Sequence, residues 1–405
     1  MDTPTPKVPA LKLKRMQDLP VKGKRALVRV DFNVPMKGAK VADSRRIRET
    51  LPTLKHLIDA GAKLVLISHL GRPKGKPEAK YSLKPVVAEL AAFLGVPIAF
   101  SDDCVGAEAE KVVAGLKPGG VALLENLRFH AGEEANDPEF AKALSRLGDV
   151  FIQDAFGALH RAHASTEGLP RLLPGGIGLL VQRELEFLDR VMGNPERPFL
   201  AIIGGAKVSD KIGVMMKLLD RVDALVIGGG MAYTFLSAQG ISVGKSLLEK
   251  DKVGDAQAIV EKAYSRKVDC LLPADHAAVK EIRADAEVTV TQGMALPPDL
   301  IGVDIGPHSI EFFTEKIAAA KTIFWNGPMG IFELEPFSKG SFAVARAMAE
   351  ATRKGTVTII GGGDSLAVLG AAGLEDAMSH CSTGGGASLE LLEGKILPGL
   401  AALSA

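Results

Sequence analysis

Arginine and histidine side chains follow three apolar runs in the first half of the chain. The pairs are His69 with Arg72, Arg128 with His130, and His160 with Arg161, after the runs at 63–68, 121–124 and 149–153. Guanidinium groups form bidentate, charge-assisted hydrogen bonds to phosphate and carboxylate groups. Strands of one parallel sheet end at a common edge, so the pattern predicts an anion-binding site at that edge.

Glycine-rich turns follow apolar runs in the second half. They are 204–205, 228–230 and 361–363, after the runs at 199–203, 224–227 and 356–360. A fourth turn, 384–386, leads into an apolar-periodic stretch that predicts a helix. Backbone without Cβ atoms admits a ligand closely, and N–H groups at a helix start attract anions. One such turn is more often structural, but four at strand ends predict a polyphosphate-sized ligand.

Two predicted helices begin with clustered cations. These are Arg45, Arg46 and Arg48 after Ser44, and Lys207 and Lys211 after Gly204-Gly205. Positive charges near a helix N-terminus oppose the helix dipole and repel one another. A bound anion would resolve both conflicts, although the arginines could instead point into solvent.

Carboxylates at two places admit a functional and a structural interpretation. Asp31 and Asn33 follow the strand predicted at 26–30, on one side of an extended chain, where they could receive hydroxyl groups or simply form a turn. Asp364 is the carboxylate within a glycine turn. It could contact magnesium, which takes one or two carboxylates plus phosphate oxygens, or it could be a helix N-cap.

Other metal chemistry is disfavoured. His160 and His163 are three residues apart, but Arg161 lies between them and no carboxylate or thiol stands at a typical metal-ligand spacing. The cysteines, Cys104, Cys270 and Cys381, are widely spaced without a CxxC pair. This usage argues against structural zinc and favours a reducing compartment.

Length and charge restrict the class of protein. The 405 residues are too many for one comfortable core and predict two domains. The net charge of +1 disfavours nucleic acid or a membrane surface as a partner. The N-terminal segment has no apolar core of a signal peptide, and eighteen apolar residues never run together, so we expect a cytoplasmic protein.

Seven phrases, in order along the chain, resemble those of the phosphoglycerate kinase family. They are RVDFNVP (29–35), SHLGRP (68–73), ENLRFH (125–130), GGAKV (204–208), WNGP (325–328), GGGD (361–364) and STGGGAS (382–388). The resemblance covers the chain from about residue 20 onward.

The resemblance implies an α/β fold of two Rossmann-like, three-layer domains with parallel sheets joined by a hinge helix. We expect the acceptor domain at 1–178, the hinge helix at 179–193, the nucleotide domain at 194–393, and the tail 394–405 packed back on the first domain. The implied reaction is reversible in-line phosphoryl transfer between 1,3-bisphosphoglycerate and MgADP, giving 3-phosphoglycerate and MgATP. It also implies domain closure and a monomeric enzyme of glycolysis and gluconeogenesis.

The resemblance also implies residue roles. The acceptor residues are Asp31, Phe32, Asn33, Arg46, His69, Leu70, Gly71, Arg72, Arg128, His160 and Arg161. The nucleotide residues are Lys207, Lys211, Gly228, Gly229, Gly302, Asn326, Glu333, Gly362, Gly363, Asp364 and Ser365, with Asp364 as the magnesium ligand. The catalytic residues are Arg46, Lys207, Gly385 and Gly386, which would surround the charge that spreads over the transferring group.

Two other functions remain open at this point. A nicotinamide-dependent dehydrogenase is disfavoured by the paired Lys207 and Lys211 and because neither triple-glycine segment completes a GxGxxG motif. Residues 240–246 are also one residue too short for a P-loop. An anion-sensing protein that had lost turnover is disfavoured because every motif residue of both sites is present.

Overall fold

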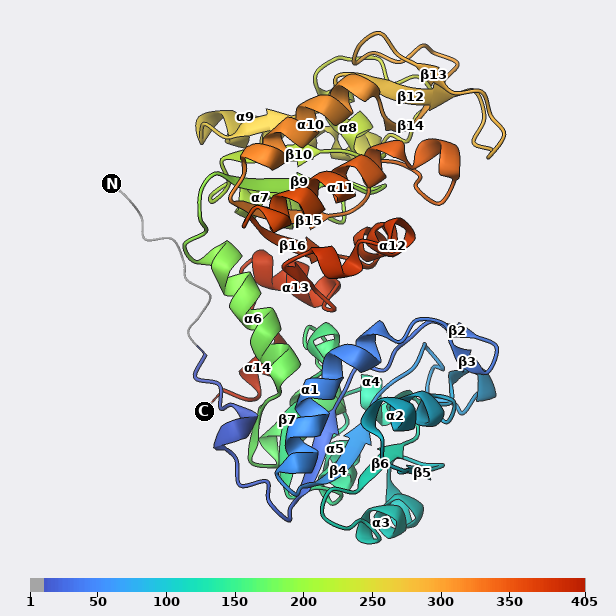
Figure 1. Cartoon of the computed structure of the whole chain (residues 1–405), viewed down its shortest axis with the longest axis vertical. Coiled ribbons are helices and arrows are strands. Elements are labelled where there is room, and N and C mark those ends of the chain that lie inside the picture. The colour runs from blue at the N-terminus through green and yellow to red at the C-terminus, as the bar shows by residue number, and fades with distance from the viewer. Residues whose placement is uncertain (1–10, 405) are drawn as a thin grey trace. The chain divides into compact units, whose positions relative to one another are not determined.

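The computed structural model describes residues 11–404. The chain divides into two compact units. The N-terminal unit contains the chain up to Glu186 together with the segment from Ile396 onward, and the C-terminal unit contains Phe187–Lys395. Each unit has a six-stranded sheet flanked by helices (Figure 1).

The sheet of the N-terminal unit has the order β5-β6-β4-β1-β7-β8, with all neighbours parallel. Its strands are β1 (Arg25–Arg29), β4 (Lys63–Ile67), β5 (Ile98–Ser101), β6 (Val121–Leu124), β7 (Val150–Gln153) and β8 (Gly175–Ile177). The helices are α1 (Arg45–Asp59), α2 (Val86–Leu94), α3 (Gly106–Ala114), α4 (Ala131–Glu134), α5 (Pro138–Ser145) and α14 (Pro398–Ala401). The central strands are buried on both faces, as their continuous apolar sequences predict.

The C-terminal unit has a sheet of order β11-β10-β9-β15-β16-β17, also parallel throughout. Its strands are β9 (Phe199–Ile203), β10 (Ala224–Ile227), β11 (Asp269–Leu271), β15 (Thr322–Asn326), β16 (Val357–Gly361) and β17 (His380–Cys381). The helices are α7 (Ile212–Leu218), α8 (Ala232–Ala238), α9 (Val253–Ser265), α10 (Pro307–Ala319), α11 (Lys339–Arg353), α12 (Gly363–Ala372) and α13 (Gly386–Leu392). One core joins the sheet to α10, α11 and α12 through Phe313, Val344 and Val368.

Two antiparallel elements have no counterpart in the sequence prediction. A three-stranded sheet of the C-terminal unit contains β12 (His276–Val279), β13 (Thr289–Val290) and β14 (Ile301–Ile305), and the N-terminal unit has a hairpin of β2 (Met36–Lys37) and β3 (Lys40–Val41). Strands β2, β3 and β13 have only two residues each, too few to show a recognisable periodicity.

Helix α7 begins later than the sequence predicts. It starts at Ile212 with Lys211 as its N-cap, so the prediction of a helix directly after Gly204-Gly205 is wrong. Gly205 has a φ of 102°, and the ammonium group of Lys211 donates to the carbonyl oxygens of Gly204 (2.6 Å) and Asn326 (2.9 Å). These bonds hold the intervening segment in a turn, and Lys207 lies in that turn, exposed.

Residues 175–177, just before the expected end of the acceptor domain at 178, form strand β8. Gly175 and Gly176 pair with β7, and a Cβ atom on either would overlap Leu403 or the backbone of Lys14. The glycines therefore serve close packing within the N-terminal unit. Helix α6 (Leu179–Met192) follows, and the division between the units falls inside it.

The last residues of the chain are part of the N-terminal unit. Gly399 donates its N–H to the carbonyl oxygen of Leu159 at 3.0 Å, and Ser404 pairs with Leu13 in an antiparallel bridge. Leu397 and Leu400 are buried. The N-terminal unit is thus assembled from both ends of the sequence.

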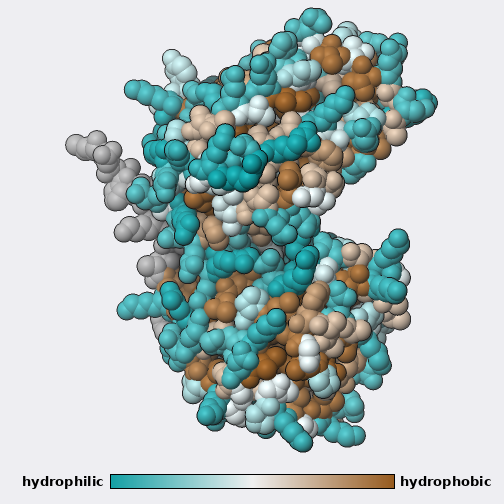
Figure 2. Space-filling view, viewed as in Figure 1, coloured by the Kyte–Doolittle hydropathy of each residue, from teal (hydrophilic) through white to brown (hydrophobic). Residues whose placement is uncertain are grey.

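Hydrophilic residues predominate on the face of the molecule in Figure 2, with apolar residues interspersed among them. Among residues 11–404, no helix is both long enough and apolar enough to cross a membrane.

The start of α6 rests on a buried carboxyl group. The Asp154 side chain accepts N–H bonds from Leu180 (3.0 Å) and Val181 (3.4 Å), and Gly178 leaves room for it because a Cβ there would overlap the carboxyl group. Burial raises the pKa of Asp154 to about 8. The folded protein therefore keeps a proton here that the unfolded chain releases near pH 4.

We expect Asp154→Asn to flatten the pH dependence of folding stability. Because the folded-state pKa is raised, the group's stabilisation is complete below about pH 4 and is lost as the pH rises to about 8. The free energy of unfolding of the wild type should therefore fall relative to that of the variant as the pH rises through this range. Denaturant titrations at several pH values would measure the difference. Asp149→Asn is the opposite control, since Arg25 lowers the pKa of Asp149. Parallel curves for Asp154→Asn and wild type would contradict the expectation.

Candidate active site

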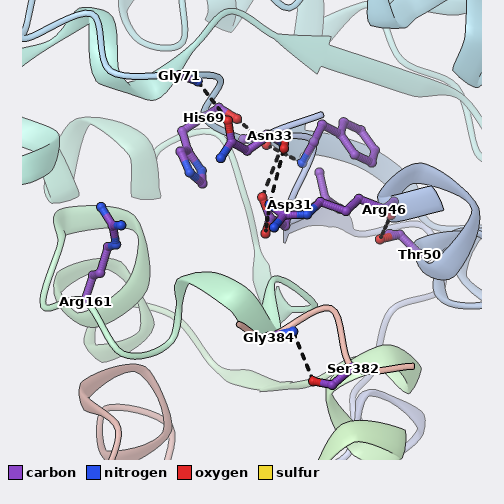
Figure 3. Close-up of polar contacts among 12 residues, drawn as sticks. Asp31, Asn33, Arg46, Thr50, His69, Gly71, Arg161, Ser382 and Gly384 are labelled. Atoms are coloured by element: carbon purple, nitrogen blue, oxygen red, sulfur yellow. Dashed lines mark hydrogen bonds and ion pairs between the residues drawn. The ribbon is translucent and has the colours of Figure 1, made fainter. Parts of the chain in front are cut away.

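The anion-binding residues predicted in the first half lie at the carboxyl edge of the N-terminal sheet. Asp31 follows β1, His69 follows β4, Arg128 follows β6 and Arg161 follows β7, and β6, β4, β1 and β7 are consecutive neighbours. Parallel pairing therefore brings together residues that are up to 130 positions apart. Figure 3 shows several of these side chains.

A chain of hydrogen bonds connects Asp31, Arg46, Asn33 and Gly71 (Figure 3). Arg46 donates Nη1–H to Asp31 Oδ2 at 2.9 Å and to the Asn33 carbonyl at 3.2 Å. The Asn33 side-chain oxygen accepts the N–H of Gly71 at 2.9 Å. Arg46 thus reaches back from the first turn of α1 to the end of β1, and the predicted conflict with the helix dipole is relieved by a carboxylate. Arg48 is exposed, in line with the solvent alternative for one arginine.

His69 is held as a neutral hydrogen-bond donor. Burial lowers its pKa well below the ordinary value, and four arginine charges act in the same direction: Arg29, Arg128, Arg161 and Arg46. Nη2 of Arg29 lies 3.1 Å from Nδ1 of His69. Because a guanidinium group can only donate, Nδ1 must be the acceptor and the ring proton is on Nε2. An Nε2–H group suits an anionic ligand.

Arg29 was not predicted as a site residue. It is buried within β1 and donates from Nε to Ser165 Oγ at 2.9 Å. Ser165 Oγ in turn donates to Glu133 at 2.6 Å, and Glu133 is also fully buried. A charged side chain inside an otherwise apolar strand was the one available signal in the sequence.

The remaining predicted acceptor residues differ in their surroundings. Arg128 is buried and donates to the Gly71 carbonyl at 2.9 Å, and burial lowers its pKa to about 10. Arg161 donates to Nε2 of His160 at 3.3 Å. Arg72 is exposed. Phe32 and Leu70 are buried in the core beneath the site.

The C-terminal unit contains a cavity of about 560 Å³ beside its glycine turns. Of the predicted nucleotide residues, it is lined by Gly229, Gly302, Glu333 and Asp364. The others do not line it: Lys207, Lys211, Gly228, Asn326, Gly362, Gly363 and Ser365. Lys245 lines the cavity but was not predicted, although it belongs to the segment that was rejected as a P-loop.

Close backbone packing explains the glycine turns. Gly229 has a φ of 68°, and a Cβ there would lie 2.6 Å from backbone atoms of Gly205 and 2.8 Å from the Pro328 carbonyl oxygen. Gly205 donates its N–H to that same oxygen at 2.9 Å. The turns after β9, β10 and β15 therefore lie against one another and form one wall of the cavity.

Asp364 and Ser365 lie in the first turn of α12 and have different environments. The N-cap of α12 is Gly362, so the N-cap interpretation of Asp364 is wrong. Asp364 is exposed and lines the cavity, where its carboxylate oxygens suit a hard divalent cation such as magnesium. Ser365 is buried, and its hydroxyl accepts the Gly327 N–H at 2.6 Å. Ser365 thus fixes the turn after β15 to α12.

Asn326 is also turned away from the cavity. Its side chain is buried, and a Cβ on Gly362 would lie 2.9 Å from its amide nitrogen. Its backbone carbonyl oxygen accepts a hydrogen bond from the ammonium group of Lys211. Both features place Asn326 in the support of the glycine turns.

The turn at 384–386 begins α13, as the sequence predicts. Gly385 is the N-cap with a φ of 47°, and Gly384 donates its N–H to the Ser382 hydroxyl at 3.1 Å (Figure 3). The Ser382 and Ser388 hydroxyls are 2.7 Å apart. These bonds fix the conformation of the turn.

Comparisons with known proteins assign this arrangement to a family. The family model "Phosphoglycerate kinase" matches residues 16–395. The phosphoglycerate kinase of Elusimicrobium minutum is 55% identical over 393 residues, covering 97% of this chain and 98% of that protein, and that of Chloroherpeton thalassium is 51% identical over 395 residues, covering 97% and 100%. The structure of phosphoglycerate kinase from Coxiella burnetii has a TM-score of 0.86 and 42% identity, covering 96% of this chain and 98% of that one. Matches of this extent show that the chain belongs to the phosphoglycerate kinase family, which consists of glycolytic phosphotransferases.

Proposed function

We propose that the N-terminal unit binds 3-phosphoglycerate or 1,3-bisphosphoglycerate and that the C-terminal unit binds MgATP or MgADP. The observation that carries this assignment is the neutral His69 surrounded by four arginine charges. Such a cluster offers donors to a ligand with both a phosphate and a carboxylate. The glycine-lined cavity of the C-terminal unit offers close backbone approach to a nucleotide.

The acceptor would be positioned by several donors of the N-terminal unit. Nε2–H of His69 and the guanidinium groups of Arg128 and Arg161 face the anionic groups, and Arg72, exposed, is available to close over them. Asp31 and Asn33 receive the hydroxyl end. His160 supports Arg161 through their 3.3 Å hydrogen bond.

Transfer would be direct and in line, without a covalent enzyme intermediate. The transition state spreads negative charge over the equatorial oxygens, so catalysis requires positioned donors more than a nucleophile. Arg46, Lys207 and the N–H groups at Gly385 and Gly386 supply them. The leaving group is a carboxylate, which needs no strong general acid.

Magnesium would be held by Asp364 together with the nucleotide's phosphate oxygens. When bound, magnesium neutralises phosphate charge and orients the transferring group. The fit rests on an exposed carboxylate at the cavity wall, beside backbone N–H groups at the start of α12.

We expect Asp364→Asn to weaken the magnesium dependence of nucleotide binding. The amide keeps the size of the side chain and removes the charge that attracts the cation. Calorimetric titration of ADP at increasing magnesium concentrations would measure the change. Asp376→Asn, an exposed position just beyond α12, is the matched control. An unaltered magnesium response in Asp364→Asn would remove Asp364 from the metal site.

The substrates bind to separate units, so we propose a closing motion about α6 and the chain near Gly394. Closure excludes water and prevents hydrolysis of the reactive phosphoryl group. Small-angle scattering should therefore show a smaller radius of gyration with both substrates bound than with either alone. An unchanged radius would contradict the hinge. We also propose that the protein is monomeric and cytoplasmic.

The direct test is turnover with 3-phosphoglycerate and MgATP, followed through a coupled step that oxidises NADH. Turnover in the wild type would support the reaction, and its collapse in Lys207→Ala, at an exposed lysine outside the carbonyl contacts, would support the nucleotide assignment. Binding of MgATP without turnover would instead favour an anion-sensing protein.

A further inference from the structure

A second cavity of the N-terminal unit lies apart from the arginine cluster. Its volume is about 860 Å³. Its lining includes Ser82, Lys84, Asp102, Asp103, Glu125 and His130. Carboxylates outnumber cations along the wall, so the cavity favours a positively charged ligand.

Three potential metal ligands of different chemistry meet at this wall. A carboxylate oxygen of Asp103, the sulfur of Cys104 and a ring nitrogen of His130 lie within 4.8 Å of one another. Ligand atoms around a tetrahedral zinc ion are about 3.5 Å apart, as follows from bond lengths of ~2.0–2.3 Å. Asp103 and His130 are 45% and 34% exposed, so modest rotation of these two side chains would reach that geometry.

The fold brings these ligands together from neighbouring strands. Asp103 and Cys104 follow β5 at the start of α3, and His130 follows β6 just before α4, with β5 and β6 paired (Figure 1). Cysteine spacing argued against such a site, because the thiol and the imidazole are 26 positions apart and meet only through the pairing of β5 with β6.

Existing contacts already keep the proposed ligands close together. Asp103 Oδ1 accepts the N–H of Cys104 at 2.6 Å and lies 2.7 Å from Nε2 of His130. The His130 ring stacks on Phe140, with centroids 5.1 Å apart. The contact between Asp103 and His130 joins two proposed ligands, so metal binding would replace it, whereas the stacking on Phe140 would remain and orient the imidazole.

We propose that Asp103, Cys104 and His130 bind a thiophilic divalent cation of the zinc class. Nitrogen, sulfur and carboxylate oxygen together suit zinc, whereas magnesium prefers oxygen alone. As the metal–sulfur bond forms, the Cys104 thiol releases its proton to bulk water. The fourth coordination position faces the cavity, because Asp103 and His130 line it while Cys104 is buried behind them.

The ion would cross-link the turns that follow β5 and β6. His130 lies two residues after Arg128, whose N–H donates to the Asn126 side chain at 3.0 Å. Binding should therefore restrain the turn that positions Arg128. Amide hydrogen exchange at 126–131 should slow when Zn²⁺ is added to the wild type and should not slow in His130→Gln.

Cobalt(II) is the probe that identifies the ligands. Titrated into the full-length protein with a thiol-free reductant and no nucleotide, Co²⁺ should bind one equivalent and give a thiolate-to-metal charge-transfer band. Cys104→Ala should abolish the band, while the Cys270→Ala/Cys381→Ala double variant should keep it. His130→Gln should weaken binding at least about 10-fold, whereas His56→Gln, on a different element, should not.

The proposal would be overturned by the absence of a charge-transfer band in the wild type, by a band that survives in Cys104→Ala, or by a band that depends on Cys270 or Cys381. Cys104 is buried, and its replacement could impair folding. His130→Gln, at a half-exposed position, then decides the question, and unchanged cobalt affinity in that variant would equally overturn the site.

Discussion

Replacing Arg46 by lysine is expected to lower kcat by about 100-fold or more, with nucleotide affinity nearly unchanged. Lysine keeps the positive charge but loses the planar fork that can bind two oxygens at once. In the structure one guanidinium nitrogen contacts both Asp31 and the Asn33 carbonyl, which leaves the other donors for the transferring group. Steady-state kinetics with both substrates varied, together with ADP binding by calorimetry, would measure the two effects.

Arg48→Lys is the matched control for this prediction, since Arg48 belongs to the same helix and is exposed. It should retain wild-type kcat. If Arg46→Lys also retained it, Arg46 would have no role in the transition state and would serve only to hold Asp31.

Lys211→Met is expected to lower both activity and stability. The ammonium group donates to two backbone carbonyls between the glycine turns. Methionine keeps an unbranched side chain of similar size but has no hydrogen-bond donor. Loss of these bonds should destabilise the protein by about 1–3 kcal/mol, and kcat/KM should fall roughly 100-fold because the turns form the cavity wall.

Burial lowers the pKa of Lys211 to about 8, so activity that depends on its charge should decline in the wild type above that pH.

Two further lysines separate these contributions. Lys207→Met should reduce kcat/KM without a change in melting temperature, because Lys207 is exposed and lies before α7. Lys217→Met, exposed within α7, should change neither quantity. A Lys211→Met variant with wild-type melting temperature would show that the carbonyl contacts contribute nothing to stability.

The central strands of the two parallel sheets could be predicted because they are continuous apolar runs followed by chemically distinctive turns. The site of the N-terminal unit followed from the same pattern, since parallel neighbours deliver His69, Arg128 and Arg161 to one edge. Strand β8 could not be predicted, because its glycines are explained by side chains and backbone over 150 residues away in sequence, such as those of Leu403 and Lys14.

The limits of sequence reasoning are clearest where a tertiary contact decides the role. The tautomer of His69 depends on Arg29, which lies 40 positions earlier. In the sequence Arg29 is only a charged residue within an apolar run. Lys211 was expected to bind a polyphosphate, but its ammonium group donates hydrogen bonds to two carbonyl oxygens of the chain. The roles assigned to the individual site residues stay predictions until variants are measured.

The placement of residues 396–404 in the N-terminal unit has a consequence for biosynthesis. Leu397, Leu400 and Leu403 are buried in the N-terminal unit, although they are translated after the whole of the C-terminal unit. The nascent N-terminal unit therefore stays incomplete while more than 200 residues of the C-terminal unit are translated. At about 5–20 residues per second, that interval is on the order of tens of seconds. During it Gly175 and Leu159 lack the residues that later contact them, Leu403 and Gly399.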